Sequence, residues 1–163
     1  MLDASSKAPG LAPGLKQPAK RPGGEFWFVV TLTLGACALR FVDLSARTYW
    51  SDESFTLYRI FGSWADLLSN AINLQGLATF DIHPPLYFAA LKLWGGAAGT
   101  SEFALRAFSA YCGVIVVPIS YVLGRRLFGG RTGIFVALLA ALCPAYEWYS
   151  WEVRMYSMMP MLA

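Results

Sequence analysis

The residues best suited to chemistry lie in three short polar clusters between hydrophobic segments. The first cluster contains the adjacent carboxylates Asp52 and Glu53, and the second contains His83, the only histidine of the chain, followed by two prolines. The third contains Glu152 and Arg154. A carboxylate at a membrane interface can act as a general base, a metal ligand or an electrostatic anchor, and an imidazole can donate a hydrogen bond to an anion.

Each cluster also has an ordinary structural explanation. Acidic pairs are common in solvated loops, and a lone histidine is more often structural than functional. Glu152 and Arg154 could simply form an ion pair between helices. Charged groups at a membrane edge are costly to place, however, so three such clusters between apolar segments favour a role beyond solvation.

The composition is that of a membrane protein. Hydrophobic residues make up 56% of the chain and charged residues 14%, whereas about a quarter of a typical soluble domain is charged. The net charge of +3 is small and several cations lie near the start of the chain, so no basic face suits nucleic acid. The three cysteines fall in apolar runs, and their odd number argues against a disulfide framework.

The first 24 residues predict a disordered cytoplasmic tail. They combine prolines and glycines with Lys7, Lys16, Lys20 and Arg21, and they are too polar to bury a core. A signal peptide is the rival interpretation, because basic residues precede an apolar run. No small-residue cleavage pattern follows that run, which favours a retained membrane anchor.

Hydrophobic runs separated by charges predict the membrane spans. In the first of them, Arg40 is expected to snorkel beside Asp43, which would let the helix extend to about Leu44. The basic residues before it predict a cytoplasmic N-terminus and an external exit. The expected spans cover about 26–44, 105–125 and 131–150, with a fourth beginning at about 155.

Residues 45–104 are expected to form a long external loop whose helices lie on the membrane surface. The run 54–72 has apolar residues at helical spacing, with a helix start around Ser63. The run 84–99 resembles a span, but crossing would place the arginines around Arg125 outside, against the positive-inside rule. The expected fold is therefore all-α, a polytopic membrane protein with interfacial helices in its first external loop.

Five motifs then occur in a fixed order: WSDE at 50–53, DIHPPLY at 81–87, SEFALR at 101–106, GRRLFG at 124–129 and YSWEVRMY at 149–156. In this order they resemble the membrane glycosyltransferases of the GT-C class. The nearest resemblance is to bacterial relatives of the protein O-mannosyltransferases, glycosyltransferase family 39, which include aminoarabinose transferase-like enzymes. The resemblance covers residues 26–163 and makes residues 25–163 the N-terminal part of such a domain.

The resemblance implies transfer of a hexose or pentose from a polyprenyl-phosphate donor to an acceptor hydroxyl on the external face of the membrane, with inversion. Lipids, proteins and polysaccharides of the cell envelope are all possible acceptors. The implied location is the inner or plasma membrane, with several spans. The resemblance implies no certain cofactor, and a divalent metal is possible.

The resemblance also implies roles for individual residues. Asp52 matches the catalytic carboxylate and would act as general base, with Glu53 supporting it. Binding of the donor phosphate falls to His83, Arg154 and Arg106, and Glu152 would orient the acceptor or bind a metal. Phe55 and His83 stand where aminoarabinose transferases have basic residues, which favours the mannosyltransferase-like branch over lipid A modification.

Two other classes of function remain open. A proton- or ion-coupled transporter would use the same ionisable residues, but these lie at or beyond the ends of the expected spans. A membrane scaffold without chemistry is the second alternative. Enzymes of the GT-C class have more spans than this sequence contains, so the chain is expected to be an N-terminal fragment that is inactive alone.

Overall fold

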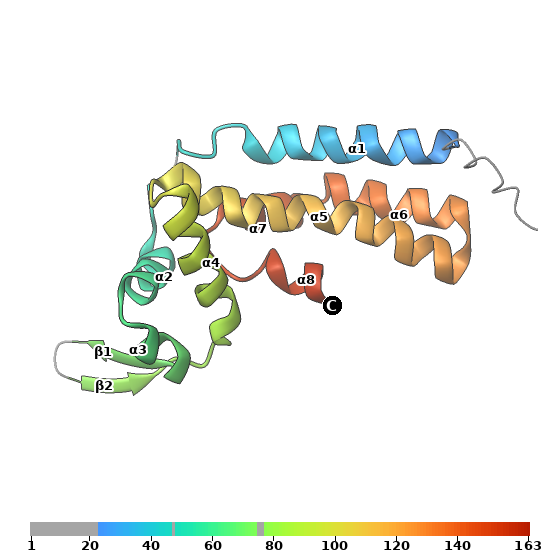
Figure 1. Cartoon of the computed structure of the whole chain (residues 1–163). Helices are drawn as coiled ribbons and strands as arrows, with labels where there is room; N and C mark the ends of the chain where they lie inside the picture. Colours follow the sequence, from blue (N-terminus) through green and yellow to red (C-terminus); the bar gives the residue numbers. More distant parts are fainter. Residues whose placement is uncertain (1–22, 47, 75–76) are drawn as a thin grey trace, which may run out of the picture.

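The computed structural model describes residues 23–46, 48–74 and 77–163, and the predicted tail at 1–24 lies almost wholly outside them. Long apolar helices lie side by side, and a smaller module of short helices and a β-hairpin is attached at one end (Figure 1). This arrangement confirms the expected all-α membrane fold. The expected 131–150 span is divided between two helices, and the other two coincide with single long helices.

Among the described residues, two helices are by themselves long and apolar enough to cross a membrane: α1 (Gly24–Phe41) and α5 (Glu102–Phe128). Taken as one broken span, α6 (Gly130–Leu142) and α7 (Pro144–Trp151) are together also long and apolar enough to cross, and they are bent by 48° at their junction. The expected fourth segment is represented by α8 (Met158–Leu162). Small and β-branched residues pack α1 against α5 and α6, including Val29, Ala36, Val117 and Ala137.

The junction between α6 and α7 explains why Arg40 does not snorkel as expected. Pro144 begins α7 and has no N–H to donate to the preceding turn. Arg40 is fully buried and donates instead to the carbonyl oxygens of Ala140 and Ala141, at 3.0 and 3.2 Å. The prediction that α1 extends to about residue 44 is also wrong, because α1 ends at Phe41.

The end module begins with α2 (Ser51–Phe61) and α3 (Trp64–Ser69). Ser63 caps α3 by accepting the Asp66 N–H at 3.0 Å, as predicted. Residues 71–72 do not continue the helix as expected, because Asn70 adopts a left-handed conformation (φ 57°) and ends it. An antiparallel hairpin follows, made of β1 (Ala71–Leu74) and β2 (Leu77–Phe80).

The last element of the module, α4 (Pro85–Ala98), begins at the second proline of the pair, and the first proline is its N-cap. Its 14 residues span about 21 Å, which is shorter than the roughly 30 Å hydrocarbon core of a bilayer. It runs crosswise to α5 (Figure 1). The largest buried cluster joins α4 to α5 and to the segment after α7, through Tyr87, Phe88, Leu91, Leu105 and Val153.

Candidate active site

The first and third polar clusters meet where α2 begins. The centre of this contact is Glu53, whose side chain is 2% exposed. Its Oε1 accepts the backbone N–H of Val153 at 2.8 Å, and its Oε2 accepts from Arg106 Nη2 at 3.2 Å. Oε2 also accepts the Trp50 N–H at 3.3 Å, which caps the first turn of α2. One carboxylate therefore joins three segments that are distant in the sequence.

Asp52 differs from the buried Glu53 in exposure, since its side chain is 42% exposed. Arg154 holds this residue in two ways. Its Nη1 donates to the backbone oxygen of Asp52 at 3.2 Å, and its Nη2 lies 3.7 Å from the Asp52 carboxylate. The Arg154 side chain is buried and its guanidinium lies 5.7 Å from the centre of the Tyr156 ring. The exposed carboxylate is thus fixed beside a cation that cannot move freely.

Arg106 is buried beside Glu53 and also donates to the carbonyl oxygen of Leu44, at 3.2 Å. Its guanidinium lies 5.0 Å from the centre of the Tyr49 ring. Burial, together with the negative charge of Glu102, raises the pKa of the Tyr49 hydroxyl to about 12, so that this group stays neutral. The predicted phosphate ligand Arg106 is therefore tied into the structural core of the site.

A cleft of about 310 Å³ opens above these groups, lined by Thr48, Trp50, Glu53, Arg106, Trp148, Trp151 and Glu152. Glu152 accepts a hydrogen bond from Trp148 Nε1 at 2.8 Å. Burial raises the pKa of Glu152, and the negative charges of Glu53 and Asp52 add to this effect, while Trp148 and Arg154 oppose it. A carboxyl, an indole edge and buried charges thus face one cleft.

His83 lies apart from this cluster. Its Nδ1 is 2.6 Å from Asp81 Oδ1, and the other Asp81 oxygen is 2.6 Å from Arg59 Nη1. In the part of the chain that is described, no hydrogen bond or ion pair joins His83 directly to Asp52. Burial alone would raise the pKa of Asp81, but the hydrogen bonds from His83 and the charges of His83 and Arg59 outweigh it and hold this pKa below its ordinary value.

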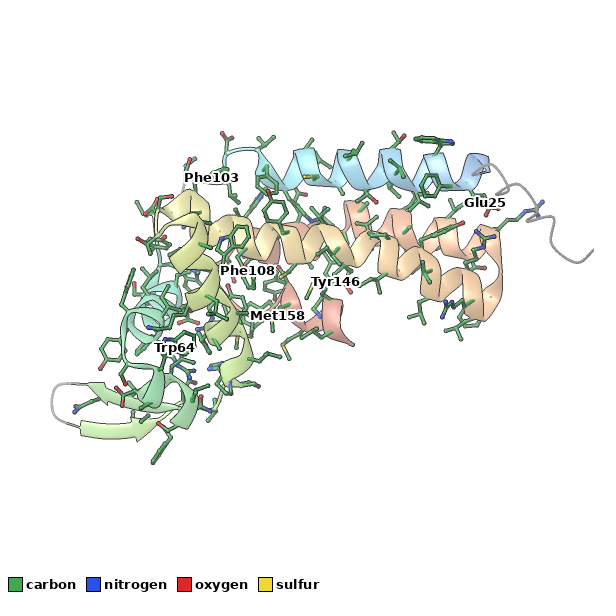
Figure 2. All side chains as sticks on the ribbon, in the orientation of Figure 1. Glu25, Trp64, Phe103, Phe108, Tyr146 and Met158 are labelled. Atoms are coloured by element: carbon green, nitrogen blue, oxygen red, sulfur yellow. The ribbon has the colours of Figure 1, made fainter. Side chains whose placement is uncertain are left out.

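An apolar groove leads away from His83. Its first part, about 400 Å³, lies between the start of α4 and α8 and is lined by His83, Pro84, Leu86, Tyr87, Met155, Met158, Met159, Leu162 and Ala163. A second part of about 590 Å³ shares Leu86, Met158 and Leu162 with it and continues along α4 and α5. Phe108 and Met158, both labelled in Figure 2, line this second part.

The site contains residues whose importance the sequence did not reveal. Asp81 begins the DIHPPLY motif, which by itself indicates no role for the carboxylate, and Arg59 lies within the apolar pattern of α2. An arginine on the buried face of an amphipathic helix is a usable signal, because such a charge needs a partner. Among the described residues, no group of three or more His, Cys, Asp or Glu side chains could hold a metal ion, so the metal role considered for Glu152 has no ligand set there.

One of the comparisons with known proteins gives a match. A family model described as dolichyl-phosphate-mannose-protein mannosyltransferase matches residues 82–162. The match includes His83, Arg106, Glu152 and Arg154 and begins after Asp52 and Glu53. No curated protein and no solved structure matches the chain significantly. Through residues 82–162, the chain belongs to a GT-C, mannosyltransferase-like family of membrane proteins.

Proposed function

We propose that this protein transfers a hexose or pentose from a polyprenyl-phosphate donor to an acceptor hydroxyl, with Asp52 as general base. The observation that carries the proposal is the contrast within the acidic pair. Glu53 is buried and holds three segments together, which leaves Asp52 as the exposed carboxylate, fixed beside Arg154. A base must reach its substrate, and Asp52 is the more exposed of the two, whereas both oxygens of Glu53 already accept hydrogen bonds.

The proposed reaction is a single displacement with inversion. Asp52 accepts the proton of the acceptor hydroxyl as its oxygen bonds to the anomeric carbon of the sugar. The bond from that carbon to the phosphate oxygen breaks, and its electron pair leaves with the polyprenyl phosphate. Fixed cations that face the developing charge would stabilise this leaving group.

Three residues are candidates for binding the donor phosphate: His83, Arg154 and Arg106. Arg154 has the best supported role, since its guanidinium lies beside the exposed carboxylate of Asp52. Arg106 would act indirectly, by holding Glu53 in place. Glu152, which lines the cleft, would orient the acceptor.

The apolar groove beside His83 supports a lipid-linked donor. A polyprenyl chain needs a continuous hydrophobic surface that ends at a polar group able to bind phosphate. The two connected parts of the groove offer methionine, leucine and aromatic walls, with His83 at one end. We further propose that this end of the bundle faces the outside of an inner or plasma membrane, with the N-terminus in the cytoplasm.

The test is the Asp52→Asn variant of the protein that contains this chain. The variant is expressed in membranes, and transfer of radiolabelled sugar from polyprenyl phosphate is measured. The amide keeps the size of the side chain but cannot accept the proton, so transfer should fall by about 100-fold or more. Asp66→Asn, an exposed acid of α3 outside the cleft, is the matched control and should retain transfer. Full activity of Asp52→Asn at normal membrane levels would refute the role of Asp52.

A further inference from the structure

We infer that Asp81 is a positioning residue for His83 and that Arg59 holds Asp81 in place. The inference deepens the proposed function and rests on it, because it explains how one imidazole is oriented toward a lipid phosphate. Its physical basis is a chain of three side chains, those of Arg59 in α2, Asp81 after the hairpin and His83 before α4, joined by two short contacts.

The first contact fixes the imidazole. Asp81 Oδ1 accepts the backbone N–H of His83 at 3.0 Å and lies 2.6 Å from its ring Nδ1. A carboxylate accepts hydrogen bonds only, so the short distance requires a proton on Nδ1. Nε2 is therefore the ring nitrogen left for a ligand, and it has no hydrogen-bond partner among the residues that the structure describes.

The second contact fixes the carboxylate. Asp81 Oδ2 receives a hydrogen bond from Arg59 Nη1 at 2.6 Å, and the Arg59 side chain is 2% exposed. Arg59 also donates to the carbonyl oxygen of Leu67 and to Asn70 Oδ1, at 3.0 and 2.6 Å. Its guanidinium lies 3.9 Å from the centre of the Phe88 ring in α4. Arg59 cannot turn away without losing all of these contacts.

The backbone completes the arrangement. The Asp81 N–H donates to the Asn70 carbonyl oxygen at 2.9 Å, which closes the base of the hairpin. Directly after His83, the double proline fixes the chain at the start of α4. Asp81 is thus held through both its side chain and its backbone, and His83 is held through both its backbone and its ring.

The consequence concerns the groove. His83 is 30% exposed and stands at the end of the apolar groove, where the phosphate of a lipid donor would lie. With Nδ1 occupied by Asp81, the protonated ring would donate its second proton from Nε2 to a phosphate oxygen. A carboxylate that orients a histidine in this way also selects its tautomer.

A simpler explanation is that Asp81 and Arg59 only close the hairpin. The two explanations differ in one measurable property, the tautomer of the neutral His83 ring. Because the chain has one histidine, selective ¹⁵N-histidine labelling of the full chain in micelles gives a single imidazole to observe. The wild-type ring should carry its proton on Nδ1, and Asp81→Ala should shift it toward the Nε2–H form.

The matched control is Asp66→Ala, which removes a carboxylate of the same module that contacts Ser63 and not His83. Its tautomer should equal that of the wild type. If Asp81→Ala fails to fold, Asp81→Asn keeps the size of the side chain and a weaker acceptor, and it should also increase the Nε2–H share. In the transfer assay, Asp81→Ala should lose about 10-fold to 100-fold, the range typical of partners that orient a functional histidine.

A wild-type ring protonated on Nε2, or a tautomer that does not respond to either Asp81 variant, would overturn the inference even if Asp52→Asn abolishes transfer. Normal transfer by both Asp81→Ala and His83→Gln would also overturn it and leave the role of Asp52 intact. An active Asp52→Asn would instead overturn the proposed function while the tautomer still depended on Asp81. The two failures are therefore distinguishable.

Discussion

The two ends of the helix bundle each carry a glutamate–arginine pair, and the pairs differ mainly in burial. At the site end, where α2 and α5 begin, Glu53 and Arg106 are 3.2 Å apart and 2% and 3% exposed. At the turn end, where α5 meets α6, Glu25 and Arg125 are 3.4 Å apart and 48% and 57% exposed. Figure 2 labels Glu25 at that end. The two pairs have similar distances but very different electrostatic energies, because water screens the Glu25–Arg125 pair and not the Glu53–Arg106 pair.

The turn end is held together by close backbone packing instead of charge. Gly133 of α6 lies so near α5 that an added Cβ atom would be 2.8 Å from the Tyr121 carbonyl oxygen and 2.9 Å from Arg125 N. Small residues allow this approach, as they do in many membrane helix pairs. The protein therefore has a buried ion pair at the end where chemistry is proposed, and a close contact between helix backbones at the other end.

The largest effect should come from breaking the buried pair. Glu53→Gln keeps the shape of the side chain but removes the carboxylate charge that faces the buried Arg106, and breaking a buried pair in this way typically costs about 3–5 kcal/mol. The free energy of unfolding in mixed micelles measures this loss.

Glu25→Gln is the matched control at the turn end. Since its pair is about half exposed, the same chemical change should cost less than about 1 kcal/mol. Equal losses for the two variants would show that burial does not separate the two ends, and the comparison would fail.

A smaller effect should come from the glycine contact. Gly133→Ala forces the α5 and α6 backbones apart, and overpacking of this kind costs about 1–3 kcal/mol. Gly35→Ala in α1 meets nothing within 4 Å and should be neutral or stabilising by up to about 1 kcal/mol through helix propensity. The unfolding free energies of the two variants check the prediction, and a stable Gly133→Ala would contradict it.

Much of this organisation could be predicted from local sequence. Uncharged runs locate α1 and α5, and alternating topology predicts that the clusters at 50–53 and 151–154 meet at one end of the bundle. The structure joins them through Glu53 and Val153. Signals of this kind are strong because each depends on the composition of a single segment.

The remaining features depend on partners that a local pattern does not identify. By its position in the sequence, Arg40 is expected to snorkel. In the structure it donates instead to carbonyl oxygens at the break between α6 and α7, which are about 100 residues away in the sequence. The hairpin at 71–80 consists of two four-residue strands, each too short to interrupt an apolar helical pattern by itself. Asp81 gains its significance only when Arg59, 22 residues earlier, reaches it. In each case the missing information is a long-range contact.

The smallest effect should have the opposite sign and belongs to Glu152. Because burial raises its pKa in the folded state, its stabilising contribution is present below the ordinary pKa of a glutamate and is lost as the pH rises through the raised folded value. At pH 7 the charge therefore opposes folding, and Glu152→Gln should increase the unfolding free energy slightly, by about 0.5 kcal/mol. This gain should disappear when unfolding is measured at a pH below the ordinary pKa of a glutamate, where the wild-type carboxyl is also neutral.

A loss of stability at both pH values would mean that Glu152 acts as a structural anchor like Glu53. A gain in stability together with a loss of sugar transfer would instead show that the two glutamates have different roles. Glu53 would stabilise the site, whereas Glu152 would orient the acceptor and lower the stability of the fold.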